Sequence, residues 1–361
     1  MLSSSIWSSS ALTLAMRDVT DADNSSVHMV WDCGEASLQS LGGMLGPVTF
    51  RLPDGRPVQP LHVAPWEDED LSNHPPILRR LRGEWPCVPF GMPPEAPLPE
   101  RWKLDAGSAS HAPDVAGAYP HGFGSNHHWR LASDGVLEMT AEIDYPPSSA
   151  ISHLHRRITA TPGKAELRFE LSIRARRDCH LPIGLHPVFT LSSEPGSMHL
   201  DPGDYAAVHT HPLEESGGIT PFESDAIFAD LSKLPARDGS FIDACRLPLA
   251  SPSENLLLLS GASGKAALTN TAGGYVTELE WDRHVFPSLM LWISNRGRTH
   301  APWSGRHLAL GMEPVRAAFD LGEQVSAANN PLRQAGIETS WAFTAGECLT
   351  TRYSIRCMPR L

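Results

Sequence analysis

The strongest constraint on the fold is a two-residue alternation of apolar and polar side chains. Between residues 137 and 145, every second side chain is apolar, and the positions between them hold Glu, Thr and Asp. The segment 167–175 repeats the pattern with Arg, Glu and Ser at the polar positions. Because successive side chains of a strand point to opposite faces, such a segment has one buried and one solvated face. Both segments therefore predict half-buried strands of an antiparallel sheet.

Turn signals connect these strands to others. Thr161-Pro162-Gly163-Lys164 separates a strand near residues 151–158 from the strand over 167–175, and Gly273-Gly274 separates 268–271 from 275–281. The chain contains 29 Gly and 32 Pro, and no segment shows a long, capped 3.6-residue periodicity. Many short strands with turn signals predict an all-β fold, a large antiparallel β-sandwich.

The chain reads as one domain over residues 1–361. Its best boundary candidate is the Pro-rich stretch 93–99, which fits a loop on a single domain better than an interdomain linker. Residues 1–24 are either a first strand or a loosely ordered end. All-β folds often form one unit at this length.

Composition excludes several classes of protein. A net charge of −12 argues against a nucleic-acid partner, because that binding depends on Lys and Arg. No apolar stretch approaches the 18 or so residues of a membrane span, and no basic segment precedes the apolar patch near the N-terminus. The six cysteines are scattered without a CxxC pair, so we expect reduced thiols, no metal site and a cytoplasmic protein.

Three short segments carry proton-transferring side chains: His121-Gly122-Phe123, His186-Pro187-Val188-Phe189 and Gly311-Met312-Glu313-Pro314. A proline follows both His186 and Glu313 and favours extended geometry at these two residues, on or at the ends of strands. Two imidazoles and a carboxylate can move a proton from one oxygen to another at neutral pH. Glu313 lies in an apolar neighbourhood, where an unpaired carboxylate is costly. Catalysis is the leading reason for it, and a buried partner such as Arg316 is the alternative.

In order and spacing, the three segments resemble motifs of the aldose 1-epimerase (galactose mutarotase) family. The His121 segment, with Asn126 and Trp129, resembles that family's HGF-A-R-N/D…W segment. The His186 segment is similar to H-P/T-Y-F-N-L, with Val188 in place of tyrosine, and the Glu313 segment is similar to G-I-x-L-E-P. The resemblance covers roughly residues 83–320.

This resemblance implies a galactose mutarotase-like β-supersandwich with an open sugar cleft. The implied reaction interconverts the α and β anomers of a free aldose. Glu313 would be the general base at the anomeric hydroxyl, and His186 the general acid at the ring oxygen. His121 would assist at that same oxygen. No cofactor is implied, and the sequence offers no phosphate-binding loop or cluster of metal ligands.

Several further residues are candidates for binding the sugar. Trp129, Trp292 and Trp303 can stack on sugar faces, and Asn126, Asn295 and Arg306 can bond hydroxyls. Arg82 is a weak match to the family's sugar-binding arginine segment, and Asp243 lies in about the right interval for its sugar-binding aspartate. A metal site at His127-His128 is not expected, since adjacent strand residues face opposite ways.

Two alternatives stay open beside a mutarotase of free aldoses. One is a hexose-6-phosphate mutarotase, which would need a basic pocket drawn from Arg156, Arg157, Arg174, Arg176, Arg177, Arg296 and Arg298. The other is a catalytically silent carbohydrate-binding protein of the same fold, which would tolerate loss of Glu313 or His186. In each case the partner is a small-molecule sugar, and the protein is a monomer or a homodimer.

Overall fold

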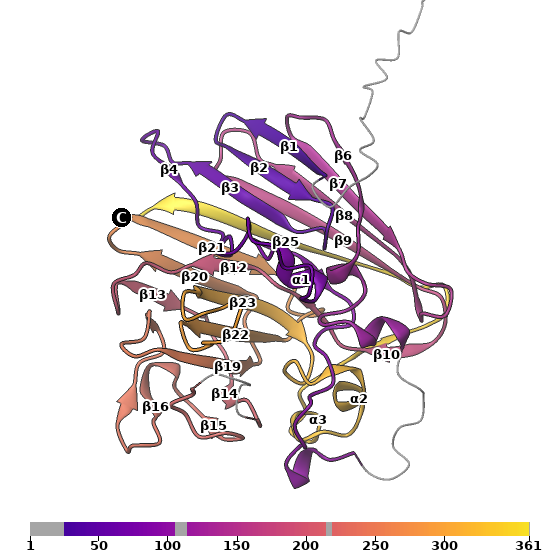
Figure 1. Cartoon of the computed structure of the whole chain (residues 1–361), viewed down its shortest axis with the longest axis vertical. Helices are drawn as coiled ribbons and strands as arrows, with labels where there is room; N and C mark the ends of the chain where they lie inside the picture. The colour runs from indigo at the N-terminus through magenta and orange to yellow at the C-terminus, as the bar shows by residue number, and fades with distance from the viewer. Residues whose placement is uncertain (1–24, 105–113, 214–218, 361) are drawn as a thin grey trace, which may run out of the picture.

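The computed structural model describes residues 25–104, 114–213 and 219–360. Two large antiparallel sheets lie face to face (Figure 1), as the alternation predicts. One hydrophobic cluster fills the space between them and draws residues from Val27 to Cys357. The predicted all-β sandwich is confirmed.

The larger sheet has nine strands in the order β18-β13-β20-β21-β25-β9-β8-β7-β6. The alternating segments form β7 and β9, and the two predicted hairpins are β8–β9 and β20–β21. The strands are β6 (Arg130–Ser133), β7 (Glu138–Asp144), β8 (Ile151–Ala160), β9 (Glu166–Ala175), β13 (Met198–Asp201), β18 (Arg246–Leu247), β20 (Lys265–Asn270), β21 (Tyr275–Trp281) and β25 (Cys348–Pro359).

The second sheet has eight strands in the order β15-β14-β19-β22-β23-β11-β5, with β12 also paired to β23. Every residue of β19 and β22 is buried, so both faces of this sheet are covered. The strands are β5 (Pro86–Cys87), β11 (Ile183–Leu185), β12 (Val188–Thr190), β14 (Ala207–Thr210), β15 (Ile227–Phe228), β19 (Ser253–Ser260), β22 (Ser288–Asn295) and β23 (Leu308–Arg316).

The two faces of the eight-stranded sheet serve different purposes. Alternate residues such as Leu257 and Leu291 belong to the cluster between the sheets. The residues between them, such as Leu256, Met290 and Trp292, belong to a second cluster on the opposite face. We call that opposite face the site face, because it carries the candidate site described below.

The remaining elements are short and pack around these sheets. A four-stranded sheet comprises β1 (Ser26–Trp31), β2 (Gly34–Gln39), β3 (Leu45–Arg51) and β4 (Pro57–Val58). Two small sheets pair β10 (Cys179–Leu181) with β24 (Trp341–Phe343), and β16 (Leu234–Pro235) with β17 (Phe241–Ile242). The helices are α1 (Pro76–Arg79), α2 (Gly322–Ala327), α3 (Pro331–Gln334), η1 (Glu100–Trp102), η2 (Val115–Ala118), η3 (Gly124–Asn126) and η4 (Leu231–Lys233).

These short helices agree with the lack of helical periodicity in the sequence. Within the described residues, no helix has the length and apolar character needed to cross a membrane. The six cysteines all lie in described segments and are free thiols.

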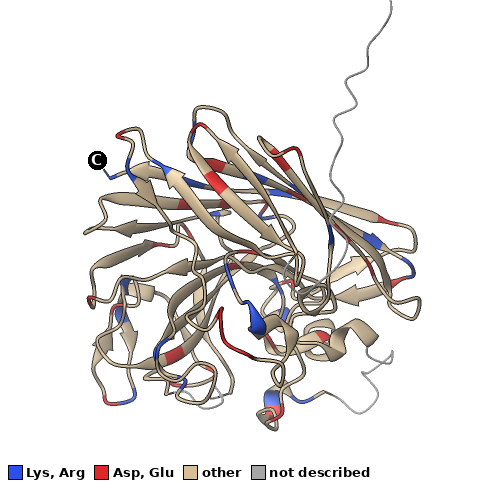
Figure 2. Ribbon diagram, turned by 45° about the horizontal axis from the view of Figure 1, so that its top comes forward, with Lys and Arg blue, Asp and Glu red and all other residues tan. Residues whose placement is uncertain are grey.

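Basic and acidic residues are interspersed along the strands of the nine-stranded sheet (Figure 2). Many of them form cross-strand ion pairs, including Arg130 with Glu142 and Arg352 with Glu170. Exposed pairs of this kind add little stability each. They balance charge locally on the surface of this sheet.

Candidate active site

A cavity of about 340 Å³ opens on the site face. A second cavity of about 600 Å³ adjoins it and shares Met92, Pro120, His121 and Asp320 with it. Aromatic and aliphatic side chains dominate the wall of the first cavity, with a few polar groups among them, as is typical of small-molecule sites. The lining residues are Pro75, Ile77, Leu78, Leu81, Trp85, Met92, Pro120, His121, His186, Leu256, Met290, Trp292, Arg298, His300, Trp303, Glu313 and Asp320.

Glu313 lies within β23, directly opposite Met290 of β22. Its carboxyl group has room because Gly311 precedes it by two residues on the same face. A Cβ at Gly311 would come within 2.3 Å of the Glu313 carboxylate. Glu313 is 0 % exposed, and neither carboxylate oxygen has a hydrogen-bond partner among the described residues. An unsatisfied buried carboxyl group facing a cavity is costly for folding and is available to a ligand.

His186 lies in the break between β11 and β12, as its following proline predicts. Its backbone N–H donates to the Trp85 carbonyl at 2.9 Å, and its ring stacks on the Trp85 indole at a centroid distance of 4.2 Å. These contacts place Nε2 at 3.5 Å from Oε1 of Glu313. That separation is too long for a strong hydrogen bond, so the two side chains are close but not hydrogen-bonded to each other.

His121 is the third member of the group that contains Glu313 and His186, and it lies in a tight turn. Its φ of 56° lies in the left-handed region, and Gly122 follows with a φ of 88°. A Cβ at Gly122 would lie 2.3 Å from the Val88 carbonyl oxygen, so the close approach of the backbone requires glycine there. The His121 ring meets His186 edge-on, with 5.0 Å between centroids. The three sequence motifs thus converge at one point of the cavity.

Burial sets the protonation of these groups. It raises the pKa of Glu313 well above its usual value, and the negative charge of Asp320 adds to the shift. Burial also lowers the pKa of His186 well below its usual value, with a contribution from His121. Both charged forms are disfavoured, so the Glu313–His186 pair favours one shared proton and no net charge. Burial, aided by the charge of Arg298, lowers the pKa of His121 to about 4 against the opposing effect of Asp320.

Asp320 contributes a second carboxylate to the wall. Its Oδ1 lies 2.9 Å from Nε2 of His211. Burial raises the pKa of Asp320, but the charge and hydrogen bond of His211 outweigh burial and leave that pKa lowered. Asp320 therefore favours its ionised form and gives the cavity a local negative charge.

Of the predicted sugar-binding residues, Trp292 and Trp303 line the cavity, whereas Asn126 and Trp129 do not. The Asn126 amide nitrogen donates to the carbonyls of Pro120 (2.7 Å) and Gly122 (2.9 Å). Asn126 thereby fixes the turn that carries His121. Trp129 is 2 % exposed and donates its indole N–H to the Gly124 carbonyl at 2.8 Å, as a core residue.

Arg82 and Asp243 also lie away from the cavity lining. Arg82 is buried and pairs with Glu67 at 2.9 Å. Asp243 follows β17, accepts a hydrogen bond from the Cys245 N–H and pairs with Arg246 at 3.4 Å. Two further candidates are engaged elsewhere: Asn295 donates to backbone carbonyls, including that of Leu249, and Arg306 binds Glu69. Direct contact with a ligand in this cavity is not expected from any of them.

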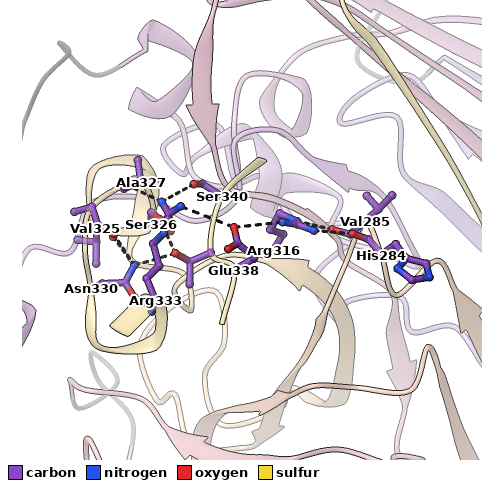
Figure 3. Close-up of polar contacts among 12 residues, drawn as sticks. His284, Val285, Arg316, Val325, Ser326, Ala327, Asn330, Arg333, Glu338 and Ser340 are labelled. Atoms are coloured by element: carbon purple, nitrogen blue, oxygen red, sulfur yellow. Dashed lines mark hydrogen bonds and ion pairs between the residues drawn. The ribbon is translucent and has the colours of Figure 1, made fainter. Parts of the chain in front are cut away.

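The alternative explanation of Glu313, a buried ion pair with Arg316, is wrong. Arg316 lies three residues further along β23 and turns to the other side of the strand. There it pairs with Glu338 at 3.6 Å and donates to the carbonyls of Val285 and His284 (Figure 3).

Trp85 and Asp320 belong to the site but were not predicted from the sequence. Neither lies within one of the three motifs that carry a proton-transferring side chain. A signal for Asp320 is a carboxylate that follows the apolar run Ala317-Ala318-Phe319. No cluster of three metal-ligating side chains occurs among the residues that the structure describes.

Comparison by sequence finds no counterpart: no family model matches the chain, and no curated protein matches it. Comparison by structure finds many. A candidate aldose 1-epimerase from Escherichia coli K12 superposes with a TM-score of 0.61 at 15% identity, covering 93% of this chain and 99% of that one. The GalM/aldose epimerase homologue from C. elegans gives 0.59 at 12% identity, with 93% and 99% covered. A galactose mutarotase-like protein from Lactobacillus casei gives 0.54 at 12%, with 92% and 100% covered.

The chain has the galactose mutarotase-like fold. The resemblance predicted from the three motifs is confirmed at the level of the fold. At these identities, the similarity does not carry catalytic residues or substrates over to this chain.

Proposed function

We propose that this protein is a mutarotase that interconverts the α and β anomers of an unphosphorylated aldose. The observation that carries the proposal is the pairing of Glu313 with His186. Their side chains approach to 3.5 Å at the wall of a cavity lined by three tryptophans. Neither the fold alone nor either residue alone would be enough to support the proposed activity.

In the proposed reaction, the Glu313 carboxylate removes the proton of the anomeric hydroxyl at O1. Protonated His186 gives its Nε2 proton to the ring oxygen O5, and the C1–O5 bond breaks to give the open aldehyde. Rotation about C1–C2 presents the other carbonyl face. The ring then closes as neutral His186 takes the O5 proton and the Glu313 acid returns a proton to O1.

The pKa shifts suit this exchange. Ring opening converts a charged pair into a neutral acid and a neutral imidazole, and closure reverses the change. Burial raises the pKa of Glu313 and lowers that of His186, so the charged pair is disfavoured in the buried site. Ring opening discharges both groups and therefore runs from the less stable charged pair to the more stable neutral pair.

The walls provide surfaces on which a pyranose could be held. Trp85, Trp292 and Trp303 offer apolar faces for sugar C–H groups. Arg298, His300 and Asp320 offer donors and acceptors for hydroxyls around the same cavity. His121 would steady the ring oxygen beside His186.

Polarimetry of freshly dissolved α-glucose and α-galactose, with and without the protein, tests the proposal. Equilibration faster than in buffer is expected for at least one free aldose. Rates equal to buffer for a panel of aldoses, from a protein with a cooperative unfolding transition, would contradict it.

The hexose-6-phosphate alternative has one observation in its favour, Arg298 in the cavity wall. The other arginines considered for a basic pocket do not line the cavity; Arg156, for example, is buried against Glu84. Acceleration for glucose 6-phosphate alone would favour this alternative. A silent sugar-binding protein would bind a sugar without accelerating its anomerisation.

A further inference from the structure

Glu254 is a buried carboxylate directly beneath the cavity wall. It lies on β19, opposite Ser294 of β22, and is 0 % exposed. Oε1 accepts a hydrogen bond from the Trp292 indole N–H at 2.5 Å, and Oε2 accepts one from the Ser294 hydroxyl at 3.1 Å. Because a buried carboxylate is costly without such partners, this arrangement points to a specific need for an acid at this position.

The positive charge of Arg298 explains why an acid is needed at position 254. The Arg298 Nε lies 3.4 Å from Oε1 of Glu254. The guanidinium also lies over the ring of Trp303, 4.6 Å from its centroid, and 5.5 Å from that of Trp292. Glu254 thus fixes one aromatic wall of the cavity through Trp292 and opposes the charge of the arginine beside it.

The charge balance of the cavity follows from these contacts. Among the described lining residues, Arg298 is the one Lys or Arg, and it faces the buried Glu254 carboxylate. Asp320 supplies a further carboxylate to the cavity lining, and His211 partly offsets its charge. An entering phosphate would meet a guanidinium that Glu254 already compensates, whereas a neutral hydroxyl could accept a hydrogen bond from Arg298 without a net positive charge being needed.

We propose that Glu254 is a specificity-determining residue. By compensating Arg298, it makes the cavity select uncharged sugars over sugar phosphates. The inference rests on the proposed function for the class of ligand, a sugar, and extends it to the charge that the ligand can carry.

Fluorescence titration tests this inference, because Trp85, Trp292 and Trp303 line the cavity. The probes are glucose, galactose and glucose 6-phosphate, each at fixed ionic strength. The wild type is expected to bind a free sugar more tightly than glucose 6-phosphate. Glu254→Gln keeps a carbonyl oxygen for Trp292 and removes the charge. It should shift relative affinity toward glucose 6-phosphate on the order of tenfold.

Three further variants separate charge from packing. Glu254→Asp keeps the charge, and Ser294→Ala removes a hydrogen bond to the same carboxylate without changing charge. Both should retain the wild-type preference. In an Arg298→Gln background, the Glu254→Gln substitution should no longer improve phosphate binding. The guanidinium whose charge Glu254 compensates is absent from that background.

The inference is overturned if Glu254→Gln leaves the ratio of affinities within twofold of the wild type, or if Ser294→Ala shifts it equally. If Glu254→Gln does not fold, the affinities of the wild-type protein for the three probes decide. Tighter binding of glucose 6-phosphate than of either free sugar would also overturn the inference. The titration needs no turnover. An inactive protein that still selects neutral sugars would refute the proposed function and leave this inference standing. If none of the three probes binds, this inference is overturned, and the proposed function is decided by polarimetry on the panel of aldoses.

Discussion

Glu313→Gln is the most direct test of the proposed chemistry, because it removes proton transfer while preserving size and shape. The side chain is fully buried in β23, and its oxygens have no hydrogen-bond partner among the described residues. The substitution therefore breaks no hydrogen bond among the described residues. Any loss of activity would reflect the reaction itself.

The expected magnitudes differ sharply for catalysis and for stability. A positioned general base contributes roughly 10²–10⁴-fold, so kcat should fall by that factor, or about 3–5 kcal/mol in the activation barrier. Because burial raises the pKa of Glu313 well above its usual value, the empty site favours the neutral acid, which glutamine mimics. The free energy of unfolding should therefore change by less than about 1 kcal/mol.

Polarimetry at saturating aldose would give kcat, and urea denaturation would give the unfolding free energy. Glu323→Gln is a matched control, since burial raises the pKa of Glu323 to about 7 and its carboxylate binds the Asp114 N–H outside the cavity lining. This control should keep wild-type kcat. A Glu313→Gln variant that retains a third or more of wild-type kcat would refute the role of Glu313 as base.

Three further predictions concern the same region. His186→Asn should lower kcat by roughly 10²–10⁴-fold while the fold persists, as followed by polarimetry and circular dichroism; unchanged kcat would contradict its role as acid. Trp292→Phe should raise KM several-fold and cost about 1–3 kcal/mol of stability, because Glu254 loses its indole donor; unchanged values in both assays would count against it. Burial lowers the pKa of His62 from 6.5 to about 4, so the unfolded chain binds a proton that the folded protein excludes. Stability should therefore fall as pH drops from 6.5 to 4, and His62→Asn should reduce that fall by about 3 kcal/mol in urea denaturation series; identical pH slopes would refute this assignment.

The sheets and the catalytic candidates were predictable because both depend on local sequence. Alternation over residues 137–145 and 167–175 favours a strand through the local sequence alone. Proline after His186 and Glu313 restricts the backbone of these residues directly. Their convergence with His121, by contrast, was inferred from the resemblance, because no local rule brings together segments that lie far apart in the sequence.

The sugar-binding residues were harder to predict because the same residue types, such as Trp and Asn, occur both in a protein core and in a ligand-binding cleft. Trp129 and Trp292 are both buried tryptophans with a bonded indole N–H. Of these two, Trp292 alone faces the cavity. Asn126 is polar for a structural reason, since it holds the turn that presents His121. Which way such a side chain points depends on tertiary packing, which the sequence pattern does not contain.

One signal in the central strands was nevertheless present in the sequence. Strands β19 and β22 are buried on both faces, so their apolar residues do not reveal which face carries the site. Acidic residues inside such strands do, because a buried carboxylate needs a partner or a ligand. Glu254 and Glu313 both fall on the site face, since Glu254 pairs in register with Ser294, and Glu313 pairs with Met290. Buried carboxylates that share one face of an apolar sheet therefore indicate a functional surface, and in this chain they indicate both the proposed base and the residue that we propose sets specificity.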